Sequence, residues 1–293
     1  MGEQVVEKAG AKINLALHVT GRRADGYHLL DSLVTFAGHG DDLSFAAATE
    51  DQFLLSGRFA SGLADEPGNL VLRARDRLRQ WLTDAGQAAP PVRITLAKAL
   101  PVASGIGGGS ADAAAALRGL MRVWNATLPE PHLSDLALSL GADVPMCLAG
   151  RPAMVRGIGE QLSSVALPAF AMVLVNPLIA VSTPGVFRFL TRRDNPPIPP
   201  LPSSTDLGDW IAFLKTLRND LAAPAQDLVP EIAETCRLLE ESGALLARMS
   251  GSGATCFGIY PDMLHAEAAA ARLAAAHPGA YIQATETLAG ETP

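Results

Sequence analysis

Pro101-Val-Ala-Ser-Gly-Ile-Gly-Gly-Gly-Ser-Ala-Asp112 is the stretch that decides the fold, because it joins a strand-like segment to a helix-like one. Val92 to Leu96 has the pattern of a β-strand, and the alanine-rich Asp112 to Trp124 predicts a helix. Glycine has no Cβ, so a ligand can approach the backbone, and free N–H groups at a helix start attract anions. A bound phosphate is therefore expected. A flexible or helix-packing turn is the alternative, and Ser110 at the helix start favours phosphate.

Two common phosphate-binding loops do not match this stretch. A P-loop requires Lys directly after the last glycine, whereas the nearest lysine, Lys98, precedes the glycines. A dinucleotide-binding fingerprint that begins at Gly105 requires glycine where Ser110 stands. The sequence therefore predicts neither an ordinary P-loop NTPase nor a Rossmann oxidoreductase.

The composition indicates a compact globular protein of one or two domains. The chain has 293 residues, of which 48% are hydrophobic and 18% are charged, so it can bury a sizeable core. Its 30 acidic and 23 basic residues give a net charge of -7. This charge disfavours nucleic acid and anionic membranes as partners, and any anionic ligand must be bound by a local feature.

Cysteine usage and the N-terminus indicate a cytoplasmic protein. Cys147, Cys236 and Cys256 are far apart in the sequence, which disfavours a zinc site or a disulfide framework and suits a reducing compartment. The first residues contain acids and no apolar secretory core. The most apolar window, Ala166 to Val175, is interrupted by Pro168 and is far shorter than the ~20 residues that span a bilayer.

The N-terminal part of the chain alternates between predicted strands and helices. Strands are expected at Ile13 to Val19, as a half-buried strand, and at Ser32 to Phe36. Asn69 stands at the N-cap position of a helix that Gly86 ends, and the apolar stripe of this helix recurs every four residues, at Leu70, Ala74, Leu78 and Leu82. A further short helix is expected from Ser134 to Gly141.

The C-terminal part has the order of a ferredoxin-like domain. A buried strand, Ala171 to Val175, precedes helices that end at Gly243, two strands, the helix Met263 to Ala276 and a last strand from Tyr281 to Thr287. Strand, helices, two strands, helix and strand make up the split βαβ arrangement. We therefore expect an α+β protein with two domains, 1–162 and 163–293.

Three motifs in this order resemble the superfamily of galactose, homoserine, mevalonate and phosphomevalonate (GHMP) kinases. They are Ala11-Lys-Ile-Asn-Leu15, the glycine stretch and Met249-Ser-Gly-Ser-Gly-Ala254. Gly21-Arg-Arg-Ala-Asp-Gly-Tyr-His28 and Gly141-Ala-Asp-Val-Pro145 extend the resemblance to the 4-diphosphocytidyl-2-C-methyl-D-erythritol kinases of the non-mevalonate isoprenoid pathway. The resemblance covers about Ala11 to Thr287, nearly the whole chain.

The resemblance implies a fold, an activity and cofactors. It implies an N-terminal domain like that of ribosomal protein S5, a C-terminal ferredoxin-like domain and an active site in the cleft between them. The activity would be ATP- and Mg²⁺-dependent phosphorylation of the substrate's 2-hydroxyl, with Ser110 near a phosphate oxygen or the Mg²⁺ ion. The expected ATP loop consists of Pro101, Val102, Ala103, Ser104, Gly105, Ile106, Gly107, Gly108, Gly109, Ser110 and Ala111.

Asp143 and Lys12 are the candidate catalytic residues. An Asp in a turn is ordinarily solvated, and the resemblance makes Asp143 the candidate base for the acceptor hydroxyl. Lys12 would ordinarily be a surface lysine, yet only four of the 23 basic residues are Lys, which suggests a specific use. It could keep Asp143 ionised and stabilise the transferred phosphoryl group. Asn14 shares its strand face and could contact the same substrate.

Tyr27, His28 and Phe187 are the candidate residues for recognition of a nucleobase. A buried Tyr with a bonded hydroxyl is the alternative for Tyr27, and a buried face of an amphipathic helix is the alternative for Phe187. The resemblance implies that cytosine stacks on Tyr27, that His28 contacts its edge and that Phe187 covers the other face. For Asn219 and Asp220 the sequence indicates only the end of a helix.

The sequence leaves three other functions open. They are a homoserine or mevalonate kinase, whose acceptor has no base to stack on Tyr27, a catalytically silent protein on the same scaffold, and an RNA-binding module. Lys12 and Asp143 together disfavour the silent protein. The acidic balance disfavours RNA. The oligomeric state does not follow from the sequence.

Overall fold

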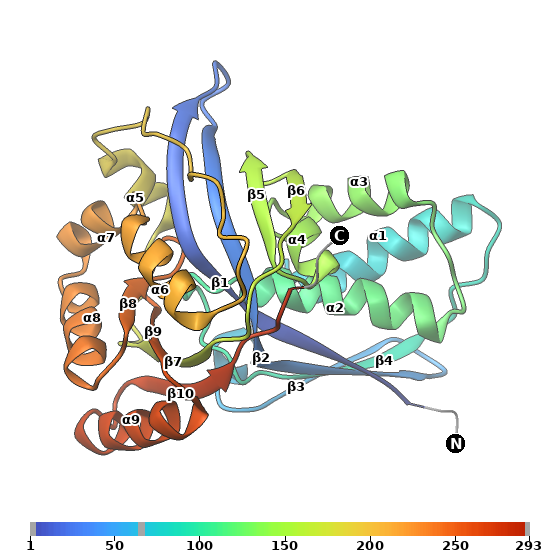
Figure 1. The fold of residues 1–293 in the computed structure, drawn as a ribbon. Coiled ribbons are helices and arrows are strands. Elements are labelled where there is room, and N and C mark those ends of the chain that lie inside the picture. Colours follow the sequence, from blue (N-terminus) through green and yellow to red (C-terminus); the bar gives the residue numbers. More distant parts are fainter. Residues whose placement is uncertain (1–3, 64–67, 291–293) are drawn as a thin grey trace. The chain divides into compact units, whose positions relative to one another are not determined.

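The computed structural model describes residues 4–63 and 68–290, and the chain forms two compact units (Figure 1). The first unit contains Met1–Ala11, Gly40–Val102 and Gly107–Gly150. The second contains Lys12–His39, Ala103–Ile106 and Arg151–Pro293. The two long N-terminal strands contribute to both units. The boundary expected between residues 162 and 163 stays a prediction.

The first unit combines strands with a group of helices. Strand β4 (Val92–Ala97) pairs in parallel with β3 (Gln52–Ser56) and antiparallel with residues 42–47 of β2 (His28–Ala47). The short helix η1 (Ala60–Leu63) follows β3. The helices pack against one another and are α1 (Leu70–Asp84), α2 (Gly108–Val123), α3 (Glu130–Leu140) and α4 (Val144–Ala149).

Local sequence accounts for the start, the end and the buried face of α1. The Asn69 side chain accepts a hydrogen bond from the backbone N–H of Val71 at 2.9 Å, which confirms the predicted N-cap. Gly86 follows the last turn with a φ of +71°, a conformation that favours glycine. Three of the four predicted stripe residues, Ala74, Leu78 and Leu82, are fully buried, whereas Val71 replaces Leu70 on the buried face.

Two helices of this unit begin earlier than the sequence predicted. Helix α2 begins at Gly108 and not at Asp112, because the last glycines of the loop already adopt helical geometry. Helix α3 begins at Glu130 and not at Ser134, because Pro131 is compatible with a first helical turn. Gly141 ends α3 as predicted.

The N-terminal part of the second unit contains the inner portions of two long strands. Strand β1 (Val5–Arg22) pairs with β2, and residues 30–34 of β2 pair with β5 (Ala153–Gly157). Strand β5 pairs in turn with β6 (Gln161–Ser164). The expectation of a half-buried strand at 13–19 was wrong, because residues 11–19 are buried on both faces of β1.

The C-terminal part confirms the ferredoxin-like arrangement. Its antiparallel sheet has the order β10-β7-β9-β8, which is the order of a split βαβ unit. The strands are β7 (Ala171–Asn176), β8 (Leu246–Met249), β9 (Cys256–Tyr260) and β10 (Tyr281–Glu286). The helices are α5 (Thr183–Phe189), α6 (Leu207–Thr216), α7 (Ala222–Leu228), α8 (Glu231–Glu241) and α9 (Met263–Ala276), and the bounds of α9 match the prediction.

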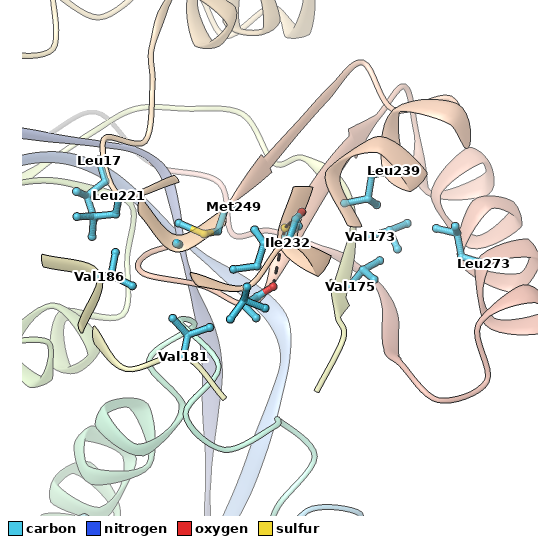
Figure 2. Packing of buried hydrophobic residues seen from close by; sticks show 14 of the residues in the cluster. Leu17, Val173, Val175, Val181, Val186, Leu221, Ile232, Leu239, Met249 and Leu273 are labelled. Carbon is cyan, nitrogen blue, oxygen red and sulfur yellow. Dashed lines mark hydrogen bonds between the residues drawn. The ribbon is translucent and has the colours of Figure 1, made fainter. Parts of the chain in front are cut away.

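The core of this part lies between one face of the sheet and its helices. Figure 2 shows Val173 and Val175, which alternate onto the same face of β7, beside Ile232 and Leu239 of α8 and Leu273 of α9. Each such side chain contributes about 1.5–3 kcal/mol when it is fully buried. None of the helices within the described ranges is long and apolar enough to cross a bilayer.

Replacement of Asn69 by alanine should destabilise the protein by about 1 kcal/mol, because the first N–H groups of α1 lose their capping acceptor. The free energy of unfolding in urea measures this change. Gln80→Ala, which truncates an exposed side chain of the same helix, is the matched control. Equal stabilities of the two variants would contradict the capping role.

Candidate active site

The three kinase-like motifs contact one another within the second unit. The backbone N–H of Lys12 donates to the carbonyl of Ile106 at 2.9 Å. The backbone N–H and hydroxyl of Thr255 both donate to the carbonyl of Ser104, at 3.1 and 2.6 Å. The loop residues 103–106 are thus hydrogen-bonded to β1 on one side and to the 249–255 turn on the other.

The backbone around residue 105 leaves room only for glycine. Its φ is +76°, and a Cβ at this position would lie 2.4 Å from the carbonyl oxygen of Gly253 and 2.8 Å from that of Ser250. Such distances are shorter than any real contact. Access for a ligand, the reason inferred from the sequence, is not the only reason for this glycine, because the 249–255 turn already excludes a side chain.

Gly107 and Gly109 leave the start of helix α2 free of side chains. Gly107 is the N-cap residue of α2, has a φ of +65° and provides no side-chain cap for the first helical turn. A Cβ on Gly109 would meet nothing closer than Leu70 Cδ1 at 3.6 Å, which is an ordinary contact. The protein therefore leaves space beside the first N–H groups of a 16-residue helix, as an anion site requires.

Ser110 lies inside the first turn of α2 and is not the N-cap residue. The cap position belongs to Gly107. The hydroxyl of Ser110 lies on the same turn as the N–H groups described above.

Lys12 is buried in β1 with only 5% of its surface exposed. An ordinary surface lysine, the alternative considered from the sequence, is therefore excluded. Lysine is rarely buried to this degree unless its ammonium group has polar partners.

Asn14 is buried on the same face of β1 as Lys12. Its side-chain oxygen is a hydrogen-bond acceptor that the described residues do not use. Its Nδ2 donates to the Ser32 hydroxyl at 2.8 Å, and its backbone N–H donates to the Ser250 hydroxyl at 3.0 Å. Its Oδ1 has no hydrogen-bond partner among residues 4–63 and 68–290, and a Cβ on Gly251 would lie 3.4 Å from it. A buried amide oxygen of this kind is suited to accept a hydrogen bond from a ligand hydroxyl.

Asn219 and Asp220 hold the 249–255 turn and β1, a role that the sequence did not reveal. Asn219 Nδ2 donates to the carbonyls of Met249 and Gly251, both at 2.8 Å. Asp220 Oδ2 accepts from the backbone N–H of Val19 at 2.7 Å. Each partner lies at least 30 residues away in the sequence, so no local pattern could have identified these bonds.

The Asp25-Gly26 turn presents Tyr27 to solvent. Asp25 Oδ1 accepts from the backbone N–H of Tyr27 at 3.3 Å, and Gly26 has a φ of +94°. Tyr27 is 61% exposed, which excludes the buried tyrosine considered as the alternative. An exposed aromatic ring on a tight turn is suited to stacking with a planar ligand.

His28 and Phe187 form a stacked pair that does not follow from the sequence. Their ring centroids lie 4.7 Å apart with an interplanar angle of 23°. Burial, with the nearby charges of Arg193 and Arg22, lowers the pKa of His28, so the imidazole is neutral at pH 7. Its Nε2 is buried and has no hydrogen-bond partner in the part of the chain described by the structure, which leaves one ring nitrogen for a ligand.

Asp143 lies at the N-cap position of α4 but does not cap it with its side chain. The residue is half-buried and belongs to the first unit, whereas Lys12 belongs to the second. The predicted interaction between Lys12 and Asp143 therefore stays a prediction.

The three cysteines are free thiols, and two of these thiols are in contact. Cys236 on α8 and Cys256 at the start of β9 have Sγ atoms 3.3 Å apart, although 20 residues separate them. Among the described residues, no group of three or more His, Cys, Asp or Glu side chains is placed to hold a metal ion.

Family models match both halves of the chain. The GHMP kinases N terminal domain matches residues 69–151, and the GHMP kinases C terminal model matches residues 203–279. The first match contains the glycine stretch and Asp143, and the second contains the 249–255 turn.

Relatives and solved structures agree with these matches. A 4-diphosphocytidyl-2-C-methyl-D-erythritol kinase from Rhizobium johnstonii is 60% identical over 288 residues, which cover 98% of this chain and 94% of the relative. The same-named protein from Agrobacterium fabrum is 56% identical and covers 97% of each chain.

A crystal structure of 4-(cytidine 5'-diphospho)-2C-methyl-D-erythritol kinase has 34% identity and a TM-score of 0.79, and covers 98% of this chain and 100% of that one. Homoserine kinase from Cytophaga hutchinsonii shares the fold at 16% identity, with a TM-score of 0.67 and coverage of 100% and 96%. Since the family models, the relatives and the fold agree, the chain belongs to the 4-diphosphocytidyl-2-C-methyl-D-erythritol kinase family of the GHMP kinases.

Proposed function

We propose that this protein transfers the γ-phosphoryl group of ATP to the 2-hydroxyl of 4-diphosphocytidyl-2-C-methyl-D-erythritol, in the non-mevalonate pathway. The relative from Rhizobium johnstonii, named as this kinase and 60% identical over nearly the whole chain, is the observation that carries the proposal. The convergence of the three motifs on one loop supports it.

The start of α2 fits the phosphates of ATP. Gly107 provides no side-chain cap, and Gly109 has room beside it, so the first N–H groups of α2 can donate to phosphate oxygens. Residues 101–111 would form the nucleotide loop, held by the bonds of Ser104 and Ile106. Because the net charge of the chain is -7, backbone donors are a suitable means to bind a polyanion.

The chain provides few ligands for Mg²⁺ at this loop. Ser110 is the residue whose hydroxyl would reach the ion. In nucleotide-binding sites Mg²⁺ is held largely by phosphate oxygens and water. When bound, the ion would neutralise charge on the transferred phosphoryl group.

Asp143 and Lys12 are the residues that would carry out the transfer. Asp143 would accept the proton of the acceptor hydroxyl, and the Lys12 ammonium would stabilise the negative charge of the phosphoryl group. The Oδ1 of Asn14 would position a substrate hydroxyl, since this buried acceptor lies near Gly251 and has no hydrogen-bond partner in the described part of the chain.

Tyr27, His28 and Phe187 would bind the cytosine of the acceptor. The exposed Tyr27 ring provides a stacking surface, and the neutral His28 can bond to the edge of the base. Phe187 now stacks on His28, so it would act by supporting the imidazole as well as by covering the base.

An ATP-consumption assay tests the proposed function directly. Turnover is expected with the cytidyl-linked methylerythritol and not with mevalonate or homoserine. Preference for either of the other two acceptors would assign the chain to another activity of the GHMP scaffold.

Replacement of Asp143 by asparagine should lower kcat by about 10²- to 10⁴-fold and leave the affinity for ATP nearly unchanged, because the proton acceptor is lost and the nucleotide loop is intact. Steady-state kinetics and ATP titration measure the two quantities. Asp135→Asn, an exposed carboxylate on the neighbouring helix α3, is the control. Turnover of Asp143→Asn at the parent rate would refute the mechanism.

Gly109→Ala should affect nucleotide binding, whereas Gly105→Ala should affect the stability of the protein. The added methyl group at residue 109 clears the protein but faces the expected phosphates, so the KM for ATP should rise by about tenfold at unchanged stability. At residue 105 it meets two carbonyl oxygens, so the melting temperature should fall by several degrees. An unchanged KM for ATP in a correctly folded Gly109→Ala variant would argue against phosphate binding at the start of α2.

Replacement of Tyr27 by alanine should raise the KM for the acceptor by roughly tenfold with little effect on ATP, because the loss of one base-stacking contact costs about 1–3 kcal/mol. Tyr27→Phe keeps the ring and should retain the parent KM. An effect confined to ATP would contradict the stacking role.

A further inference from the structure

Two of the three cysteines form a dithiol pair within the second unit. Cys236 lies on α8 and Cys256 is the first residue of β9, and their Sγ atoms are hydrogen-bonded at 3.3 Å. Both residues are free thiols. Because a disulfide bond is about 2.0 Å long, a bond between these sulfurs requires them to approach by only roughly 1.3 Å.

The packing of α8 on the sheet brings the two sulfurs together. Helix α8 packs against β8 and β9. The Cys256 thiol donates to the carbonyl of Ile232 at 3.6 Å, and Ile232 lies one helical turn before Cys236 on α8. Ile232 and Cys256 are both fully buried in the core between the sheet and its helices. The contact therefore depends on two packed backbone elements, which hold the thiols at this separation.

The two thiols differ in their access to solvent. Cys236 is half-buried, whereas Cys256 is fully buried. A small oxidant in solution can therefore reach Cys236 first, and the sulfur that lies next to it is that of Cys256. An accessible thiol with a second thiol in contact is the arrangement that leads from oxidation to a disulfide.

A buried positive charge lies near this pair. The guanidinium of Arg248 on β8 donates to the carbonyls of Leu15, Leu214 and Leu217, at 2.6, 2.8 and 2.9 Å. It forms no ion pair with a carboxylate in the part of the chain that the structure describes. Burial lowers the pKa of Arg248 to about 10, so the group is still charged at pH 7, and it attracts a Cys236 thiolate.

The electrostatic environment favours the thiolate at Cys236. The hydrogen bond with Cys256 and the charge of Arg248 lower the pKa of Cys236, although burial and the charge of Glu240 act in the opposite direction. The same hydrogen bond, together with burial, raises the pKa of Cys256, which stays a thiol. Since the thiolate is the reactive form, Cys236 is the nucleophile of the pair.

We propose that Cys236 and Cys256 form an oxidation site, at which a hydroperoxide converts the two thiols into an intramolecular disulfide. The Cys236 sulfur attacks one oxygen of hydrogen peroxide, so that an S–O bond forms, the O–O bond breaks and the released hydroxide takes up a proton. The Cys256 sulfur then attacks the sulfenic acid, so that the S–S bond forms, the S–O bond breaks and hydroxide leaves with the thiol proton as water. The two thiols lose two electrons, and one peroxide is reduced to two water molecules.

The disulfide would link α8 to the strand that follows the 249–255 turn. Cys256 directly follows Thr255, which donates to the carbonyl of Ser104, and it pairs with Met249 across β8 and β9. Neither cysteine is among the residues that we assign to ATP, to the acceptor or to phosphoryl transfer. The oxidation site therefore goes beyond the proposed function and does not depend on it.

The first experiment counts thiols in the full chain. The reduced protein is treated with hydrogen peroxide at pH 7, then denatured and alkylated with iodoacetamide, and intact mass spectrometry counts the alkylated cysteines. Two of the three thiols should be lost and Cys147 retained, with a peptide that links Cys236 to Cys256, and dithiothreitol should restore all three. Retention of all three thiols, equal loss of all three, or a disulfide between two molecules would overturn the proposal.

Single variants test the order of the two steps. Cys236→Ser should keep both of its remaining thiols at the same peroxide dose, because Cys256 is buried. Cys256→Ser should accumulate a sulfenic acid at Cys236, which dimedone captures, because the second thiol is missing. Cys147→Ser is the matched control and should form the disulfide as the parent does.

The half-buried position of Cys236 keeps the test decisive if Cys256→Ser does not fold. A hydroxyl group at residue 236 can be hydrated, so Cys236→Ser is expected to fold, and circular dichroism checks this. Oxidation of Cys256 at the parent rate in the folded Cys236→Ser variant would overturn the proposal. Protection of Cys256 in this variant, with the linked peptide in the parent, would support it.

Discussion

The close approach of Gly105 to the carbonyl oxygens of Ser250 and Gly253 is the constraint on which the site depends. No side chain fits between these backbones, and the left-handed conformation at residue 105 excludes most other residues as well. The bonds from Thr255 to Ser104 hold the same segment. The loop is therefore positioned before any ligand binds, which lowers the entropic cost of ordering it around a nucleotide.

The proposed binding of an anion by an acidic protein poses a second physical problem. The net charge of -7 opposes the approach of a polyanion, and backbone N–H groups attract it without any change in that charge. The buried group of Lys98, Asp41 and Asp112 places further ionisable groups close to these donors. Local dipoles then matter more than the overall charge.

Much of the fold follows from local patterns. The cap at Asn69, the bounds of α9 and the ferredoxin-like order of the C-terminal strands were all predicted, because capping, helical periodicity and strand alternation act over a few residues. The differences between the predicted and the observed elements also have local causes. The start of α2 was placed too late because glycine is a poor helix former, although Gly108 is helical in the structure.

The sequence by itself determined the family and predicted the nucleotide loop and the candidate residues, since these depend on residue types at fixed short spacings. Only the tertiary structure decided which groups meet: Asn219 with the turn at Gly251, His28 with Phe187, and Lys98 with Asp41 and Asp112. These partners are between 14 and 159 residues apart. Their contacts depend on strand pairing and helix packing across the whole chain, and no local spacing encodes that arrangement.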